Sequence, residues 1–218
     1  MGHEDMTYFE DVFGYQTINV AEIEKYGTKY VCVTGGEPLA QKRCKKFLER
    51  LCDEGYAVSL ETSGAMDIAR ADRRVSRVMD IKTPASREES SNRWENLAEL
   101  TPNDQVKFVI CSRPDYEWAR EQVALHDLPG YCEVLFSPAW GLLDPAELAG
   151  WILEDRLPVR FQLQLHKLLW GDEPGSWTAA TPSPGMVDMT TVDGRYLFYN
   201  NSSFDTGSGK SDDDAIAP

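Results

Sequence analysis

The sequence predicts an α/β fold built on a parallel sheet, and two observations lead to this expectation. Apolar runs rich in β-branched residues, which are typical of strands, recur roughly every 20 to 30 residues. Stretches with a helical pattern lie between them. Alternating strands and helices build parallel sheets with right-handed crossovers, so we expect one sheet with helices packed against it.

The stretch 30–38, YVCVTGGEP, is the clearest of these strand-to-helix units. Its first four residues form the apolar run that a strand buried on both faces requires. Gly35 and Gly36 allow the backbone to turn tightly, and Pro38 suits the first turn of a helix that we expect over 39–54. The stretch therefore predicts a strand that ends directly at the start of a helix.

The turn in this unit has the chemistry of a ligand site. Backbone N–H groups at the start of a helix favour an anionic or carboxylate-bearing ligand. The carboxylate of Glu37 can accept hydrogen bonds from a ligand ammonium group. A plain strand-to-helix connection explains the same two glycines, so the turn alone leaves both interpretations open.

The remaining elements follow from the same patterns. We expect strands over 57–61, 77–82, 105–110, 133–136 and 160–165, with a further short one over 194–199. We expect helices over 20–26, 92–100, from Pro114 onward, and over 145–154 after the N-cap Asp144. Beyond residue 175 the pattern is lost, which predicts a folded part over 1–175 and an irregular or disordered tail over 176–218.

Composition excludes several classes of partner. The 218 residues are 42% hydrophobic and carry a formal net charge of −14, which argues against nucleic-acid binding. No apolar run approaches the roughly 18 residues of a membrane span, and the acidic N-terminus does not resemble a leader peptide, so we expect a cytoplasmic protein without membrane partners. The five cysteines are odd in number and scattered, which favours reduced thiols over a disulfide framework.

Polar residues follow most of the expected strands. Ligands collect at the carboxyl ends of parallel strands, so these residues form a candidate site, the rim. Its members are 34–37, 61–63, 80–82 and 137–138. The ionisable side chains Glu61, Asp80 and Lys82 suit a charged small molecule, and structural salt bridges are the alternative explanation for them.

Several motifs in this order resemble one known family. They are VTGGEP, LETSG, MDIKTP, DQVKFVICSRPDYEWA, LFSP and LPVRFQLQLHKLLWGDEPG. Together they resemble 7-carboxy-7-deazaguanine synthase, a radical S-adenosylmethionine (SAM) enzyme of queuosine and deazapurine biosynthesis, over residues 26–175. GGEP is shared across the radical SAM superfamily, whereas QLHKLLWG combined with LETSG and DIKTP is far more specific.

The resemblance implies a partial (β/α) barrel and a lyase that converts 6-carboxy-5,6,7,8-tetrahydropterin to 7-carboxy-7-deazaguanine. The cofactors it implies are SAM, a 4Fe-4S cluster and Mg²⁺, and the assembly it implies is a homodimer. Residues that would bind SAM are Gly35, Gly36, Glu37, Ser63, Asp80, Lys82 and Ser137. Residues that would face the pterin are Thr34 and His166, although the sequence alone favours a structural histidine at the latter position.

The chain departs from the family in its cysteines. The family holds its cluster with a CxxxCxxC loop after the first strand, and residues 1–29 contain no cysteine. We therefore expect the first strand and the cluster ligands to be absent and the activity to be impaired. Two alternatives stay open. The first is a non-catalytic relative that binds SAM or the pterin, or a gene fragment. The second is an unrelated α/β enzyme that uses Glu61, Asp80 and Lys82 in acid–base roles.

Overall fold

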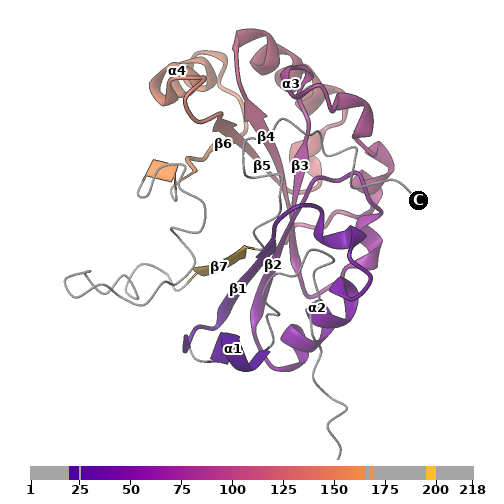
Figure 1. The fold of residues 1–218 in the computed structure, drawn as a ribbon. Coiled ribbons are helices and arrows are strands. Elements are labelled where there is room, and N and C mark those ends of the chain that lie inside the picture. Colours follow the sequence, from indigo (N-terminus) through magenta and orange to yellow (C-terminus); the bar gives the residue numbers. More distant parts are fainter. Residues whose placement is uncertain (1–19, 25, 165–166, 169–194, 200–218) are drawn as a thin grey trace, which may run out of the picture. The chain divides into compact units, whose positions relative to one another are not determined.

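The computed structural model describes residues 20–24, 26–164, 167–168 and 195–199, and these fall into two compact units. Of the described residues, unit 1 contains 20–24, 26–60, 70–75 and 195–199, and unit 2 contains 61–69, 76–164 and 167–168. Within each unit the strands are parallel and connected through helices (Figure 1). This confirms the predicted α/β class.

Unit 1 is built around strand β1, Tyr30–Thr34. β1 pairs in parallel with the first part of β2, Ala57–Thr62, and on its other side with β7, Arg195–Tyr199. The predicted short strand in the C-terminal region is therefore confirmed, and it pairs with β1 along the whole length of β1. Helix α1, Val20–Glu24, precedes β1, and Gly27 with φ of 61° follows the helix.

The expectation that both faces of β1 are buried is wrong. Val31 and Val33 are buried, whereas Cys32 and Thr34 are half-buried and Tyr30 is exposed. An apolar run looks the same in a sequence whether one face or both faces of its strand are covered, because cysteine and tyrosine tolerate either environment.

The helix predicted over 39–54 forms as two pieces. A 3-10 turn, η1, covers Pro38–Ala40, and helix α2 covers Cys44–Asp53. The carboxylate of Glu37 accepts a hydrogen bond from the backbone N–H of Leu39 at 3.0 Å, and Gln41 N–H closes the turn onto Pro38 C=O. This local hydrogen bonding ends the first turn before α2 begins. α2 buries the side chains of Cys44, Phe47, Leu48 and Leu51.

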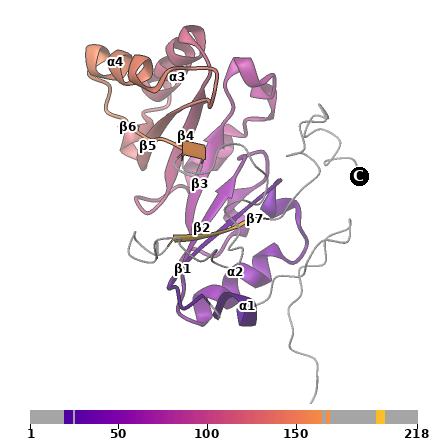
Figure 2. The same cartoon turned by 60° about the vertical axis from the view of Figure 1, so that its left-hand side comes forward.

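Unit 2 contains four parallel strands side by side (Figure 2). They are β3 Ser76–Ile81, β4 Gln105–Ile110, β5 Glu133–Pro138 and β6 Arg160–Phe161. The register pairs Asp80 with Lys107 and Val109 with Ser137. Side chains alternate between the two faces along these strands, so each face has a different composition.

One face of this sheet forms the core with helices α3, Arg113–Leu125, and α4, Pro145–Asp155. Phe108 and Phe136 meet edge to face, and Tyr116 of α3 packs against Phe136 and donates a hydrogen bond to Asp155 of α4. Asp144 caps α4 as predicted, accepting from the N–H groups of Ala146 and Glu147. The opposite face carries half-buried polar side chains, including those of Glu61, Asp80 and Lys107.

Two elements of unit 2 are shorter than predicted. The helix predicted over 92–100 is the 3-10 helix η5, Trp94–Glu99, preceded by the short turns η3, Pro84–Ser86, and η4, Glu89–Ser91. The side chain of Asn96, within this segment, bonds to the backbone that follows β2. The strand predicted over 160–165 pairs only at Arg160 and Phe161, with one further hydrogen bond from Gln162 N–H to Phe136 C=O.

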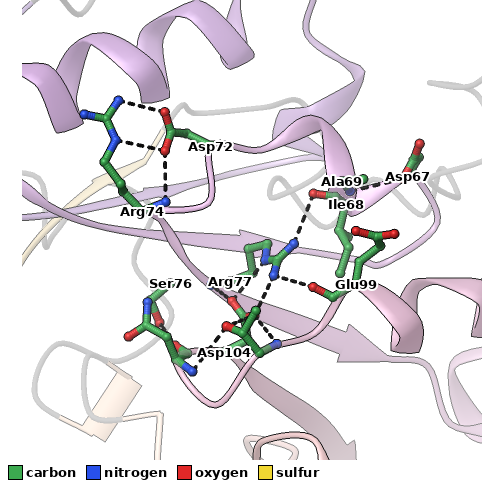
Figure 3. Close-up of polar contacts among 11 residues, drawn as sticks. Asp67, Ile68, Ala69, Asp72, Arg74, Ser76, Arg77, Glu99 and Asp104 are labelled. Carbon is green, nitrogen blue, oxygen red and sulfur yellow. Dashed lines mark hydrogen bonds and ion pairs between the residues drawn. The ribbon is translucent and has the colours of Figure 1, made fainter.

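The amino ends of β3 and β4 are joined by a buried ion pair (Figure 3). The guanidinium of Arg77 donates to both carboxylate oxygens of Asp104, and it also donates to the backbone C=O of Glu99. Thr101 donates to Asp104 through its backbone N–H and its hydroxyl. Burial would raise the pKa of Asp104, but the hydrogen bonds from Arg77 and Thr101 outweigh it and lower that pKa.

Among the described residues, no helix combines the length and the apolar composition that crossing a bilayer would require.

Candidate functional site

The glycine-rich turn of unit 1 has the predicted backbone conformation. Gly35 and Gly36 have φ of 100° and 51°, which side-chain-bearing residues rarely adopt. A Cβ atom at Gly36 would meet nothing within 4 Å, so backbone conformation rather than space favours glycine there. Thr34, at the end of β1, is half-buried and lies immediately before this turn.

Glu37 has a structural role that the sequence did not predict. Its carboxylate is the cap of η1, and a carboxylate offers about four acceptor positions. Capping one N–H group is therefore compatible with accepting hydrogen bonds from a ligand ammonium group as well.

Unit 2 holds the turn after β2 with a buried asparagine that sequence reasoning missed. Asn96 is 1% exposed and donates to the C=O groups of Gly64 and Met66 at 2.8 and 2.9 Å. It also accepts from the N–H of Ile68 at 3.3 Å. This fixes the backbone that follows Ser63, whose hydroxyl accepts from Ala65 N–H.

Gly64 within this turn is required for two reasons. Its φ is 73°, and a Cβ atom would lie 2.8 Å from the Cγ atom of Met79. The turn after β2 therefore packs tightly against β3, which fixes Ser63 relative to the residues of β3.

Asp80 and Lys82 come together at the carboxyl end of β3. Lys82 Nζ lies 3.2 Å from Asp80 Oδ2, and both side chains are about three-quarters buried, at 25% and 21% exposure. The backbone of Lys82 is held by Asn92, whose side chain accepts from Lys82 N–H and donates to Lys82 C=O, both at 2.8 Å. Asn92 is a second positioning side chain that the sequence did not reveal.

Two polar atoms at the carboxyl ends of unit 2 strands are buried without hydrogen-bond partners among the described residues. They are Asp80 Oδ1 and Ser137 Oγ, and Ser137 is 1% exposed. Asp80 also borders a cavity of about 10 Å³, close to the space one water molecule needs, which Ser63 and Trp94 help to line. Because buried polar groups are almost always hydrogen-bonded, atoms of this kind mark positions suited to a ligand or an ordered water.

Glu61 interacts with a residue outside the predicted rim. Lys107 Nζ of β4 lies 3.7 Å from Glu61 Oε2, and Lys107 is the register partner of Asp80. The structure thus brings Ser63, Asp80 and Lys82 together in unit 2 with Glu61 and Lys107 nearby. His166 lies outside the described residues.

The cysteines do not fit a 4Fe-4S cluster. All five are in the described part of the chain, and no three His, Cys, Asp or Glu side chains there converge in the way a metal site requires. Burial raises the pKa of Cys44 to about 12 and that of Cys132 to about 11, and it also raises the pKa of Cys52 and Cys111. Cluster ligation needs closely spaced thiolates, and burial opposes their formation.

Comparison with known proteins identifies the family. No family model matches the chain. This chain is 45% identical over 168 residues to the 7-carboxy-7-deazaguanine synthase of Koribacter versatilis. The matched region covers 70% of this chain and 74% of the relative. It is 40% identical over 175 residues to the enzyme of the same name from Chlorobaculum tepidum, covering 78% and 79% of the two chains. The chain belongs to the 7-carboxy-7-deazaguanine synthase family.

A solved structure supports the fold. QueE from Escherichia coli matches with a TM-score of 0.52 at 18% identity, over 66% of this chain and 61% of that one. The likeness confirms the α/β fold with parallel strands. Family membership confirms the resemblance that the motifs of the sequence carried.

Proposed function

We propose that this chain binds S-adenosylmethionine and acts in the reaction that gives its relatives their name. In that reaction 6-carboxy-5,6,7,8-tetrahydropterin becomes 7-carboxy-7-deazaguanine, in queuosine and deazapurine biosynthesis. The observation that supports binding is a pair of buried atoms, Asp80 Oδ1 and Ser137 Oγ, that have no hydrogen-bond partner in the described part of the chain. Both residues occupy positions that the family motifs assign to SAM.

In this proposal, different residues contact different parts of the ligands. Glu37 accepts hydrogen bonds from the methionine amino group, and Gly35 and Gly36 let the backbone approach it. Contacts to the remainder of SAM come from Ser63, Asp80, Lys82 and Ser137. Thr34 and His166 contact the pterin.

The scattered cysteines favour a second candidate function, a relative that binds SAM or the pterin without turning it over. The family reaction needs a 4Fe-4S cluster, and the five thiols of this sequence do not converge. Binding depends on the rim, whereas turnover depends on the cluster as well. The two candidates therefore differ in turnover and agree in binding.

Calorimetric titration with SAM tests the binding that both candidates share. We expect saturable binding of one SAM per chain, and a Ser137→Ala variant that folds normally should bind more weakly. A wild-type chain that is folded and releases no heat with SAM would contradict the proposal.

Anaerobic reconstitution with iron and sulfide then separates the two candidates. About four irons per chain together with conversion of the pterin would establish the enzyme. Binding of SAM with essentially no iron would establish the binding relative.

The proposal extends to location and assembly, with a cytoplasmic homodimer acting on a small-molecule pterin. Light scattering coupled to size-exclusion chromatography measures the mass directly. A mass of about one chain at micromolar concentration would contradict the dimer.

A further inference from the structure

Lys107 lies in an unusual place for a lysine. It sits in the middle of β4, between Val106 and Phe108, which face the fully buried core. Lys107 itself points to the opposite face of the sheet, and its side chain is only 16% exposed. Lysine is seldom buried to this extent unless its charge is matched by a partner.

Two carboxylates lie beside Lys107. Asp80 on β3 is its register partner, and register partners on parallel strands present their side chains to the same face. Glu61 at the end of β2 lies 3.7 Å from the Lys107 ammonium. With Lys82 on Asp80 at 3.2 Å, these four side chains are two carboxylates and two ammonium groups, so their charges balance.

The burial of the two partners is unequal. Glu61 is 41% exposed, whereas Lys107 is 16% exposed, so the lysine is the fixed partner and the glutamate lies toward solvent. The oxygens of a carboxylate accept hydrogen bonds, which suits the amine and hydroxyl donors of an adenosyl ligand.

We propose that Lys107 is a positioning residue that acts through Glu61: it holds the Glu61 carboxylate in the orientation that receives donor groups of the bound ligand. This inference rests on the proposed binding of S-adenosylmethionine. Lys107 itself need not touch the ligand.

A double-mutant cycle tests whether Lys107 acts through Glu61. The dissociation constant of SAM is measured by calorimetry for wild type, Lys107→Met, Glu61→Gln and the double variant. We expect each single variant to bind about tenfold more weakly and the double variant to bind no worse than the weaker single one. Lys107→Arg should recover most of the affinity, because arginine keeps the charge.

Lys45→Met is the matched control. Lys45 lies 3.8 Å from Glu49 on α2, nearly the same separation, and Glu49 is 41% exposed like Glu61, but Lys45 is 63% exposed. This variant should bind SAM like wild type. Thermal unfolding of every variant excludes loss of fold as the cause of weaker binding.

The outcomes separate the two levels of the proposal. Lys107→Met binding within twofold of wild type, or a double variant about a hundredfold weaker, overturns the role of Lys107 and leaves the proposed function standing. A folded wild type that does not bind SAM overturns both.

Discussion

The two ends of the unit 2 strands differ in how their buried polar groups are satisfied. At the amino ends, Arg77 and Asp104 are 4% and 1% exposed and each is paired through several hydrogen bonds. At the carboxyl ends, Asp80 and Ser137 each keep a buried atom without a partner among the described residues. The same sheet therefore uses buried polarity for stability at one end and leaves it available for a ligand at the other.

Removing Arg77 should have the largest effect on stability. Arg77→Met leaves the Asp104 carboxylate buried without its charge partner, and we expect a loss of about 3–5 kcal/mol in the free energy of unfolding at pH 7. Urea unfolding followed by circular dichroism measures this loss. A loss below about 1 kcal/mol would show that the amino ends do not depend on the pair.

The stability that the Arg77–Asp104 pair contributes should depend on pH. Because the folded-state pKa of Asp104 is lowered, its contribution is present above the unfolded value near 3.9 and is lost as the pH falls through the folded value. The difference between wild type and Arg77→Met should therefore shrink below about pH 4. The double variant Arg77→Met with Asp104→Leu, which leaves no buried charge, should recover most of the stability.

Asn96→Ala should have the next largest effect. It leaves two buried C=O groups and one N–H group without their side-chain partner, and we expect a loss of about 2 kcal/mol. The turn that holds Ser63 should also loosen, so SAM affinity should fall in the same variant. Normal affinity at reduced stability would show that Asn96 serves the fold alone.

Ser137→Ala should differ from these two variants, because we expect it to lower SAM affinity without lowering the free energy of unfolding. Its hydroxyl is buried and has no partner among the residues that the structure describes. Removing it should therefore leave the free energy of unfolding unchanged or raise it by about 0.5–1 kcal/mol, while SAM affinity falls severalfold. Ser76→Ala is the control at the amino end, where the serine hydroxyl donates to Asn103 C=O at 2.6 Å. That variant should lose about 0.5–1.5 kcal/mol and keep its affinity.

The sequence predicted the elements whose signals are local. Asp144 followed by Pro145 predicts a helix start from adjacent residues, and the structure places a cap there. The continuous helix over 39–54 failed because the Glu37 cap and the 3-10 turn compete with it locally. The helix predicted over 92–100 is shorter in the structure, and Asn96 within it bonds to backbone 28 to 32 residues away, which no sequence window contains.

The candidate site residues come from positions where a strand end and a motif coincide, as at Asp80 and Ser137, and their role in binding stays a prediction. Lys107 was missed because its partners lie on other strands and become neighbours only through the register. The pairing of Arg77 with Asp104, 27 residues apart, was hidden for the same reason. These pairs could not be predicted from the sequence because they depend on strand order and register.

Arg74→Met should have the smallest effect, although the pair it breaks resembles the Arg77 pair in geometry (Figure 3). Arg74 Nη2 lies 2.7 Å from Asp72 Oδ2, and Arg74 also reaches Asp53 at 2.8 Å, but its side chain is 51% exposed. Water and salt screen such a pair, so we expect no resolvable change in the free energy of unfolding at about 0.5 M salt.

The hydrogen bonds from Arg74 nevertheless lower the pKa of Asp72 to about 2. Carboxyl titration by NMR should find that pKa low in wild type and near 3.9 in Arg74→Met. A shifted pKa with unchanged stability would show that the two arginine pairs differ in burial rather than in bonding. A stability loss in Arg74→Met as large as in Arg77→Met would remove burial as the explanation.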